Sequence, residues 1–261
     1  MKIYYDNLSD SDRYLKSQED VSLEEKEIHF NNILRVIERF KSLDRSSEIL
    51  EIGTGTGWFP LLCQLHGLKC KGLEISPQLI AQAHKMGSNY GIVPDIDLGN
   101  IEETEIGRAQ YDVIIASSVF EHVQLWREGL RKIALALKPS GLLFFESTNK
   151  FSFTSGEYSA FPLYGLYGWL PDRLRYKLRI AAHGPDIMKL GVDFNQFRHS
   201  LLRREFELNG FSRILDRIEM ADERAASTAF RRLVIRGSRL AYPLKQVALT
   251  FADATRFVCI K

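Results

Sequence analysis

Two acidic side chains and a set of alternating glycines are the residues of this sequence best suited to hold a ligand. An apolar run, residues 48–52, leads into glycines at alternate positions: Gly53, Gly55 and Gly57. Glycine lacks a Cβ and tolerates positive φ, so such a turn lets the backbone approach a ligand closely. Glu51 precedes the turn, and Glu74 lies in a second apolar run, residues 71–76. A carboxylate at that place can accept both hydroxyl groups of a ribose, so the pattern predicts a nucleotide-binding strand–helix–strand unit.

The spacing of the glycines separates two classes of nucleotide ligand. Dinucleotide-binding turns follow G-x-G-x-x-G, and the third glycine lets the helix pack close to a pyrophosphate. Trp58 occupies that third position here, and its bulk disfavours a nicotinamide-dependent oxidoreductase. The pattern Glu-x-Gly-x-Gly-x-Gly, from Glu51 to Gly57, resembles the first motif of the class I S-adenosylmethionine-dependent methyltransferases. Taken alone, this motif also fits a tight turn with no ligand.

Later segments resemble the remaining motifs of that family, in the same order along the chain. Asn100 and Ile101 follow a short strand at the position that holds adenine in the family, and an Asn carbonyl can accept a hydrogen bond from the adenine amino group. Residues 111–123 resemble the fourth motif, and residues 130–147 resemble the helix, Lys-Pro-x-Gly turn and strand of the fifth. The resemblance implies S-adenosyl-L-methionine as the cofactor. The contacts it implies are Glu51, Gly53, Thr54, Gly55, Gly57, Glu74, Ile75, Asn100, Ile101 and Ser117.

The family performs in-line displacement at a methyl group, and an oxygen or nitrogen acceptor can require a general base. His122 follows the fourth predicted strand and is the candidate base; the alternative is a histidine that only fixes its loop. In quinone-biosynthesis O-methyltransferases the corresponding segment reads Glu-x-x-Glu-His and can hold a divalent metal. Ser118 replaces the first of those glutamates here, so we predict no metal site.

An aromatic segment gives the best indication of the acceptor. Residues 148–200 interleave aromatic side chains with Gly and Pro, which predicts a lid over a planar or apolar small molecule that excludes water from the reacting centre. The alternative is that these rings pack a small satellite core. The segment also loosely resembles methyltransferases of bacterial envelope pathways. The predicted substrate contacts are Tyr14, Asn149, Phe151, Tyr158, Trp169, His183 and His199.

Length and composition fit a single α/β domain, and the resemblance implies a doubly wound, seven-stranded, mostly parallel sheet of the Rossmann-like methyltransferase type. Residues 1–45 are expected to form an N-terminal helical cap, residues 46–147 the cofactor-binding half, residues 148–200 the substrate-lid insertion, and residues 201–261 the C-terminal end of the sheet. The resemblance places the last strand antiparallel between the fifth and sixth.

Local signals set the boundaries of the flanking elements. Ser22-Leu-Glu-Glu25 reads as a capping box that opens a helix to about Leu43. Further along, residues 211–220 are predicted as a strand, and residues 223–249 as mostly helical, with interruptions at Gly237 and Pro243.

Charge is distributed unevenly along the chain. Residues 173–261 hold 18 Lys and Arg against 9 Asp and Glu, a net charge of +9, whereas residues 1–172 hold 17 against 24, a net of −7. The basic, partly apolar segment from Arg224 to Lys245 is typical either of a solvated helix or of a surface that contacts anionic lipid. No compact nucleic-acid-binding module is present in the sequence, so we expect no nucleic-acid partner.

The function predicted from these observations is methyl transfer to a small molecule, with oxygen as the expected acceptor atom. A lipid-linked or glycan acceptor at a membrane surface, and a non-catalytic S-adenosylmethionine-binding protein, remain as alternatives. Three cysteines without C-x-x-C spacing indicate neither a metal nor a disulfide framework. The first residues lack the apolar core of a signal peptide, so a cytoplasmic location is expected. The sequence leaves the oligomeric state open.

Overall fold

The computed structural model describes residues 22–152, 169–171, 174, 177–178, 181, 195–223 and 228–261. The predicted contacts Tyr14, Tyr158 and His183 lie outside these residues.

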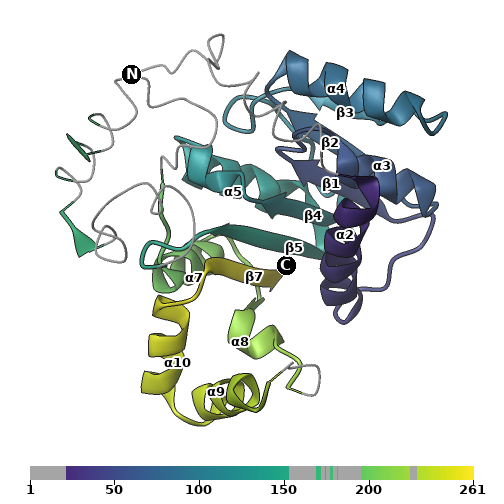
Figure 1. Ribbon diagram of the computed structural model, residues 1–261. Coiled ribbons are helices and arrows are strands. Elements are labelled where there is room, and N and C mark those ends of the chain that lie inside the picture. The colour runs from purple at the N-terminus through teal and green to yellow at the C-terminus, as the bar shows by residue number, and fades with distance from the viewer. Residues whose placement is uncertain are drawn as a thin grey trace.

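A seven-stranded sheet forms the centre of the protein (Figure 1). Its strands are β1 (Glu48–Ile52), β2 (Lys69–Glu74), β3 (Ile96–Leu98), β4 (Tyr111–Ser117), β5 (Leu137–Thr148), β6 (Arg213–Asp216) and β7 (Ala254–Ile260). They lie in the order β3-β2-β1-β4-β5-β7-β6. The first five strands pair in parallel, while β7 runs antiparallel to both β5 and β6. The predicted fold class and the placement of the last strand are therefore confirmed.

Helices cover both faces of the sheet. The helices among the described residues are α2 (Leu23–Glu38), α3 (Trp58–Leu65), α4 (Pro77–Ser88), the 3₁₀ turn η2 (Phe120–His122), α5 (Trp126–Ala136), α7 (His199–Leu208), α8 (Arg217–Met220), α9 (Ala229–Leu240) and α10 (Tyr242–Thr250). One core cluster packs α5 and α7 against Ile114 and Phe145, and a second packs α2 and α3 against Ile115 and Phe144. Neighbouring residues of β4 and β5 thus face opposite sides, and both sides are buried, as in parallel sheets covered by helices.

Three boundaries differ from the sequence prediction. The helix begins as expected, with the Ser22 hydroxyl accepting from the Glu25 N–H at 3.2 Å, but α2 ends at Glu38, short of Leu43. The predicted strand over 211–220 is wrong in its second half, because the Asp216 carboxylate accepts from the N–H groups of residues 218 and 219 and so starts α8. Gly237 lies inside α9 and does not interrupt it.

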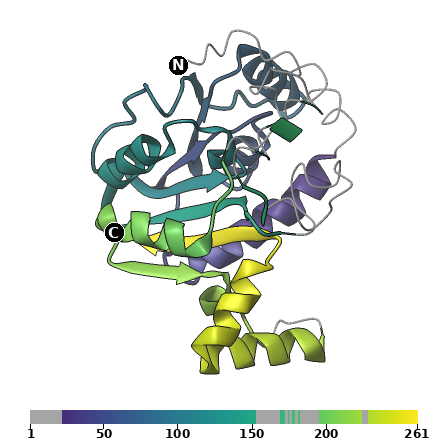
Figure 2. The same cartoon turned by 90° about the vertical axis from the view of Figure 1, so that its left-hand side faces the viewer.

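The break between α9 and α10 falls at Ala241. Pro243 occupies the first turn of α10, where its missing N–H costs no helical hydrogen bond. The two helices form a hairpin that projects away from the sheet (Figure 2). Asn149, just beyond β5, holds the end of this hairpin: its Nδ2 donates to the carbonyl oxygens of Leu249, Thr250 and Ala252 at 3.1, 2.9 and 2.7 Å.

Candidate cofactor and active site

The glycine turn lies at the carboxyl end of β1 and requires glycine for two separate reasons. Gly53, Gly55 and Gly57 all have left-handed φ, at 67°, 56° and 71°. A Cβ on Gly53 would lie 2.3 Å from Cγ2 of Val119, and one on Gly57 would lie 2.5 Å from Cβ of Ala83. The turn is therefore fixed by its conformation and by close contact with the segment that follows β4.

Glu51 is a buried acid directly before the turn. The Thr54 hydroxyl donates to its Oε2. Burial raises the pKa of Glu51 to about 8; the charge of Glu74 adds to this rise, and the Thr54 hydrogen bond opposes it. At neutral pH the side chain is mostly protonated, so a cation placed beside it would favour loss of that proton.

Glu74 ends β2 and is also buried, with burial raising its pKa against the effect of three backbone donors. Its Oε2 accepts from the Gly55 N–H at 2.7 Å, and its Oε1 accepts from the N–H groups of Ile75 and Ser76 at 2.9 and 3.0 Å. An ionised carboxylate offers about four acceptor positions. One acceptor position, on Oε2, is thus open while the Gly55 hydrogen bond is intact. The two hydroxyl groups of a ribose would use two such positions.

Asn100, two residues beyond β3, has an unpaired buried donor. Its Oδ1 accepts from the Glu102 N–H at 3.0 Å, which fixes the orientation of the amide. Its Nδ2 is buried with no partner among the described residues. An unmatched buried amide is costly, which points to an acceptor supplied by a ligand. The side chain therefore presents a donor, suited to an adenine ring nitrogen, where the sequence led us to expect its carbonyl. Ile101 beside it is buried in the core cluster with Phe120.

These three side chains lie at the carboxyl ends of β1, β2 and β3, which are neighbours in the sheet. In open α/β sheets this is the edge that binds nucleotides. Three groups lie in succession along this edge of the sheet. They are the Glu51 carboxyl, which can lose its proton beside a cation, the Glu74 carboxylate with its open acceptor position, and the unpaired Asn100 amide. The residues present fit an adenosyl cofactor carrying positive charge.

The segment after β4 borders the turn. Ser117 ends β4 in register with Glu146, and Val119 reaches Gly53. His122 ends η2, half-buried, and its N–H donates to the Val119 carbonyl at 2.9 Å. This arrangement brings His122 to the same end of the sheet as Glu51.

The carboxylate of Glu121 accepts hydrogen bonds from the end of β5. Its buried Oε2 accepts from the Ser147 hydroxyl at 2.6 Å and its Oε1 from the Thr148 hydroxyl at 3.3 Å. Among the described residues, no group of three or more His, Cys, Asp and Glu side chains is arranged to hold a metal ion. Glu121 thus ties η2 to the end of β5.

A family model described as a methyltransferase domain matches residues 26–214, well over half of the chain. The chain belongs to the class I S-adenosylmethionine-dependent methyltransferases. Its cofactor is S-adenosylmethionine, as the resemblance of the glycine turn implied.

Curated relatives of this methyltransferase include two kinds of O-methyltransferase. A malonyl-[acyl-carrier protein] O-methyltransferase of Halalkalibacterium halodurans is 31% identical over 40% of this chain and 40% of its own length. A ubiquinone biosynthesis O-methyltransferase of Coxiella burnetii (strain Dugway 5J108-111) is 24% identical over 73% of this chain and 74% of its own length. Several other matches span only about half the length of the relative.

Solved structures support the fold. A SAM dependent methyltransferase from Archaeoglobus fulgidus has a TM-score of 0.56 and 17% identity, and covers 95% of this chain and 99% of its own. A Haemonchus contortus N-methyltransferase solved with S-adenosylhomocysteine has the same TM-score and 16% identity, and covers 88% of this chain and 52% of its own.

The predicted substrate contacts within the described residues occupy different surroundings. Phe151 and Trp169 stack beyond β5 with ring centroids 4.5 Å apart, and Trp169 is largely exposed. Asn149 is engaged by the α10 carbonyls described above. His199 is buried against Phe257, with Nε2 unpaired among the described residues; burial, followed by the charges of nearby Arg and Lys side chains, lowers its pKa to about 3. A role of Phe151 and Trp169 in binding the acceptor stays a prediction. Asn149 donates to carbonyl oxygens at the end of α10, and His199 packs on Phe257.

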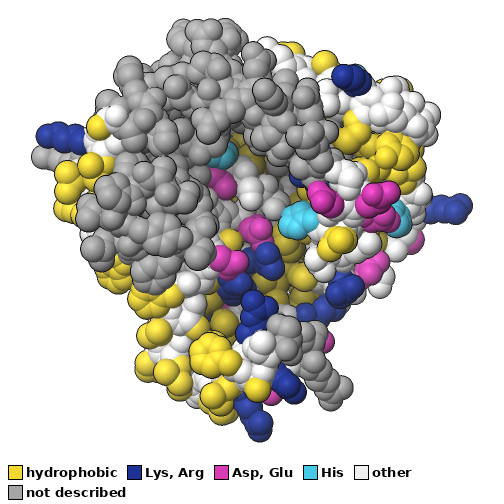
Figure 3. Space-filling model, viewed as in Figure 1, with side chains coloured by type: hydrophobic (Ala, Val, Ile, Leu, Met, Phe, Trp, Pro, Cys, Tyr) yellow, Lys and Arg dark blue, Asp and Glu magenta, His cyan; other side chains and the backbone are white. Residues whose placement is uncertain are grey.

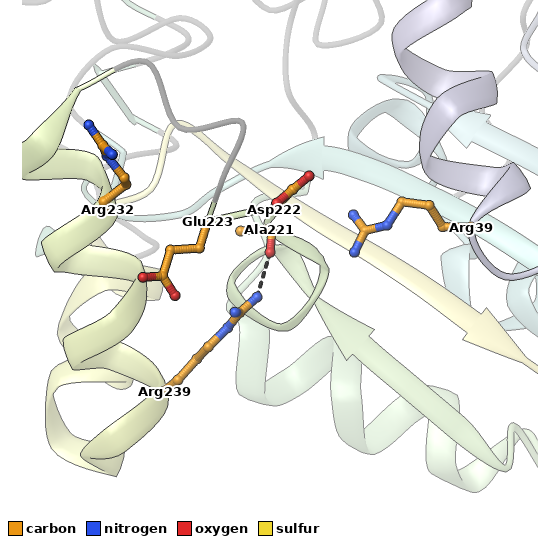
Figure 4. A pocket seen from close by; sticks show the side chains of 6 residues that line it. All are labelled: Arg39, Ala221, Asp222, Glu223, Arg232 and Arg239. Atoms are coloured by element: carbon orange, nitrogen blue, oxygen red, sulfur yellow. Dashed lines mark hydrogen bonds between the residues drawn. The ribbon is translucent and has the colours of Figure 1, made fainter.

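A hollow of about 550 Å³ lies between the end of α2 and α9, and no residue of the glycine turn lines it (Figure 4). Its lining residues are Arg39, Ala221, Asp222, Glu223, Arg232 and Arg239. Arg239 donates to the carbonyls of Ile218 and Ala221, and Arg39 donates to that of Met220. The hollow is thus lined by residues from the end of α2, from the segment that follows α8 and from α9.

Sequence reasoning missed two features of the cofactor site. Val119 packs on Gly53, and the Thr54 hydroxyl is paired with Glu51. The second could have been found, because Glu-x-x-Thr across a tight turn brings the two side chains together. The first depends on β1 and β4 being neighbours.

Proposed function

We propose that this methyltransferase transfers the methyl group of S-adenosylmethionine to an oxygen atom of a small-molecule acceptor. The observation that carries the proposal is the succession of Glu51, Glu74 and the unpaired Asn100 amide across the ends of three adjacent strands. The relatives support the choice of oxygen, since both kinds are named O-methyltransferases.

When bound, the cofactor supplies an electrophilic methyl group on a sulfonium. The residues of this chain bind the cofactor and orient it toward the acceptor. Asn100 Nδ2 would donate to the adenine, Glu74 would accept from the ribose, and Glu51 would release its proton to solvent to balance the positive charge. The glycine turn allows the backbone to approach, and the Phe151–Trp169 pair excludes water from the acceptor side.

His122 is the residue we propose as general base. It lies three residues beyond Val119, whose side chain contacts the glycine turn, so its segment borders the reacting end of the site. Replacement of His122 by Gln should lower kcat and remove one ionisation from the pH–rate profile, with cofactor affinity unchanged. An unaltered profile would leave His122 with only the role of fixing its loop.

Calorimetry with S-adenosylmethionine, followed by mass spectrometry of methylated products, tests the proposal. The candidate acceptors tested in this assay should include a malonyl thioester and a substituted phenol. Glu74→Ala should weaken cofactor binding by about 1–3 kcal/mol, because ribose hydroxyls are left unmatched. Glu103→Ala, an exposed carboxylate in the turn after β3, is the matched control and should bind normally.

The outcomes separate the alternatives. Cofactor binding with no transfer to any acceptor, including fractionated cell extract, would favour a non-catalytic binding protein. Competition by NAD would contradict the cofactor assignment.

A further inference from the structure

The α9–α10 hairpin exposes an unusual amount of apolar surface. Six of its large apolar side chains are between 54% and 82% exposed: Phe230, Leu233, Leu240, Tyr242, Leu244 and Val247. Only Ser238 of α9 and Leu249 of α10 are buried. Figure 3 shows hydrophobic side chains gathered over the region of α9 and α10, with Lys and Arg side chains beside them. Contiguous exposed apolar patches of this kind mark interaction sites.

The hairpin carries charge of one sign. Residues 228–252 contain four Arg and one Lys and no Asp or Glu, a net charge of +5. Arg239 and Lys245 fasten the hairpin to α8: Lys245 Nζ lies 2.7 Å from both the Asp216 and Glu219 carboxylates. Arg231, Arg232 and Arg236 are exposed. Glu223 lies between Arg232 and Arg239 in the hollow beside α9 (Figure 4).

The apolar and basic side chains of α9 form two adjacent strips. At about 100° per residue, Leu240, Leu233 and Phe230 fall within an arc of about 80°, and Arg236 lies about 40° beyond it. Arg232 lies one turn before Arg236 on the same side. An apolar strip bordered by arginines matches a bilayer surface, where apolar side chains enter the acyl boundary and guanidinium groups meet phosphates.

The hairpin is fixed to the body of the protein. Asn149 holds the end of α10, and the bonds of Arg239 and Lys245 hold α8 against both helices. Within the described ranges no helix is both long and apolar enough to cross a membrane.

We propose that the α9–α10 hairpin docks this protein onto an anionic lipid bilayer. The apolar strip of α9 and the exposed side chains of α10 insert between headgroups, and Arg232 and Arg236 contact lipid phosphates. This inference goes beyond the proposed methyl transfer and does not depend on it. The charge of the hairpin selects lipid over a second copy of the chain, because two copies would bring the exposed Arg231, Arg232 and Arg236 of one against those of the other.

Sedimentation with vesicles tests the proposal, using the full chain and phosphatidylcholine vesicles with and without phosphatidylglycerol. We expect binding to the anionic vesicles that weakens as salt rises from 50 to 500 mM, since screening acts on exposed charges. Arg232→Gln with Arg236→Gln should reduce the affinity by about 30-fold, the effect of two basic groups at an anionic surface. Phe230→Ser with Leu233→Ser should reduce it at least about tenfold, through lost apolar burial.

Matched controls lie elsewhere on the surface. Arg108→Gln and Val93→Ser replace an exposed arginine and an exposed apolar residue far along the chain from the hairpin, and should bind like the unchanged protein. Circular dichroism and S-adenosylmethionine affinity should be unaltered in all variants, because every substituted side chain is exposed.

Three results would overturn the proposal. They are no binding to anionic vesicles, equal losses in the control variants, and a dimer in light scattering that Phe230→Ser with Leu233→Ser converts to monomer while vesicle binding is absent. The last would identify the strip as an interface between copies of this chain.

Discussion

Replacing Glu51 by Gln should stabilise the ligand-free protein while weakening its cofactor site. The pKa of Glu51 rises from 4.5 to about 8 on folding, chiefly through burial. Between these values the unfolded chain has released the proton and the folded protein retains it, so stability falls as pH rises. The slope is about 1.4 kcal/mol per pH unit between the two pKa values and smaller near each of them, which gives a loss of about 3 kcal/mol from pH 4.5 to 7 and about 4 kcal/mol by pH 8. Glutamine has the same shape and no such ionisation.

Urea unfolding between pH 5 and 9 measures this effect. The free energy of unfolding of Glu51→Gln minus that of the unchanged protein should grow with pH up to about 8 and then level off. Glu48→Gln is the matched control, on the same strand but only partly buried, with its carboxylate paired with Lys69. Its effect should stay within about 1 kcal/mol.

Cofactor binding supplies the second half of this prediction. If Glu51 loses its proton beside a cation, binding at pH 7 should release protons, measurable by calorimetry in buffers of different ionisation enthalpy. Glu51→Gln should release none and bind more weakly. Parallel stability curves for Glu51→Gln and the unchanged protein would refute the reasoning from burial.

Two further substitutions test the contacts that hold the turn and the hairpin. Gly53→Ala should lower the free energy of unfolding by about 1–3 kcal/mol or more, because the left-handed φ and the Val119 contact both oppose a Cβ, and it should abolish cofactor binding in calorimetry. Gly53→Ala with Val119→Ala should recover part of the stability; no recovery would assign the cost to backbone strain alone. Asn149→Ala should cost about 1–3 kcal/mol, since it removes the donor to the carbonyl oxygens at and just beyond the end of α10, and should speed hydrogen exchange in α10 more than in α4. Equal exchange in the two helices would contradict the role of Asn149 as an anchor.

The cofactor half could be predicted because its signals are local. Apolar strands that end in Gly53 or Glu74 reveal both the element and the functional residue within a few positions, and parallel strands bring their carboxyl ends together. The order of β7 and β6 was predicted only from the family resemblance, because no local sequence signal indicates which strand will pair with the edge of the sheet.

The remainder depends on partners distant in sequence. Asn149 was predicted as a substrate contact because it lies in the 148–200 segment, yet its hydrogen-bond partners begin a hundred positions later. The Glu102 N–H donates to Oδ1 of Asn100, and this hydrogen bond leaves Nδ2, a donor, for the ligand. The early start of α8 could have been recognised, since Asp216 and Glu219 have the spacing of a capping box.

The pairing of β5 with β7 divides the protein into a constant and an adaptable part. The two strands pair through seven residue pairs, from Leu142 with Ile260 to Thr148 with Ala254. This pairing closes a long loop of the chain, residues 149–253, between the two strands. The entropy cost of closing such a loop grows only with the logarithm of its length, by about 0.6 kcal/mol for each doubling. Segments on the acceptor side can therefore be lengthened, shortened or exchanged between relatives while the strands that hold the nucleoside keep their geometry.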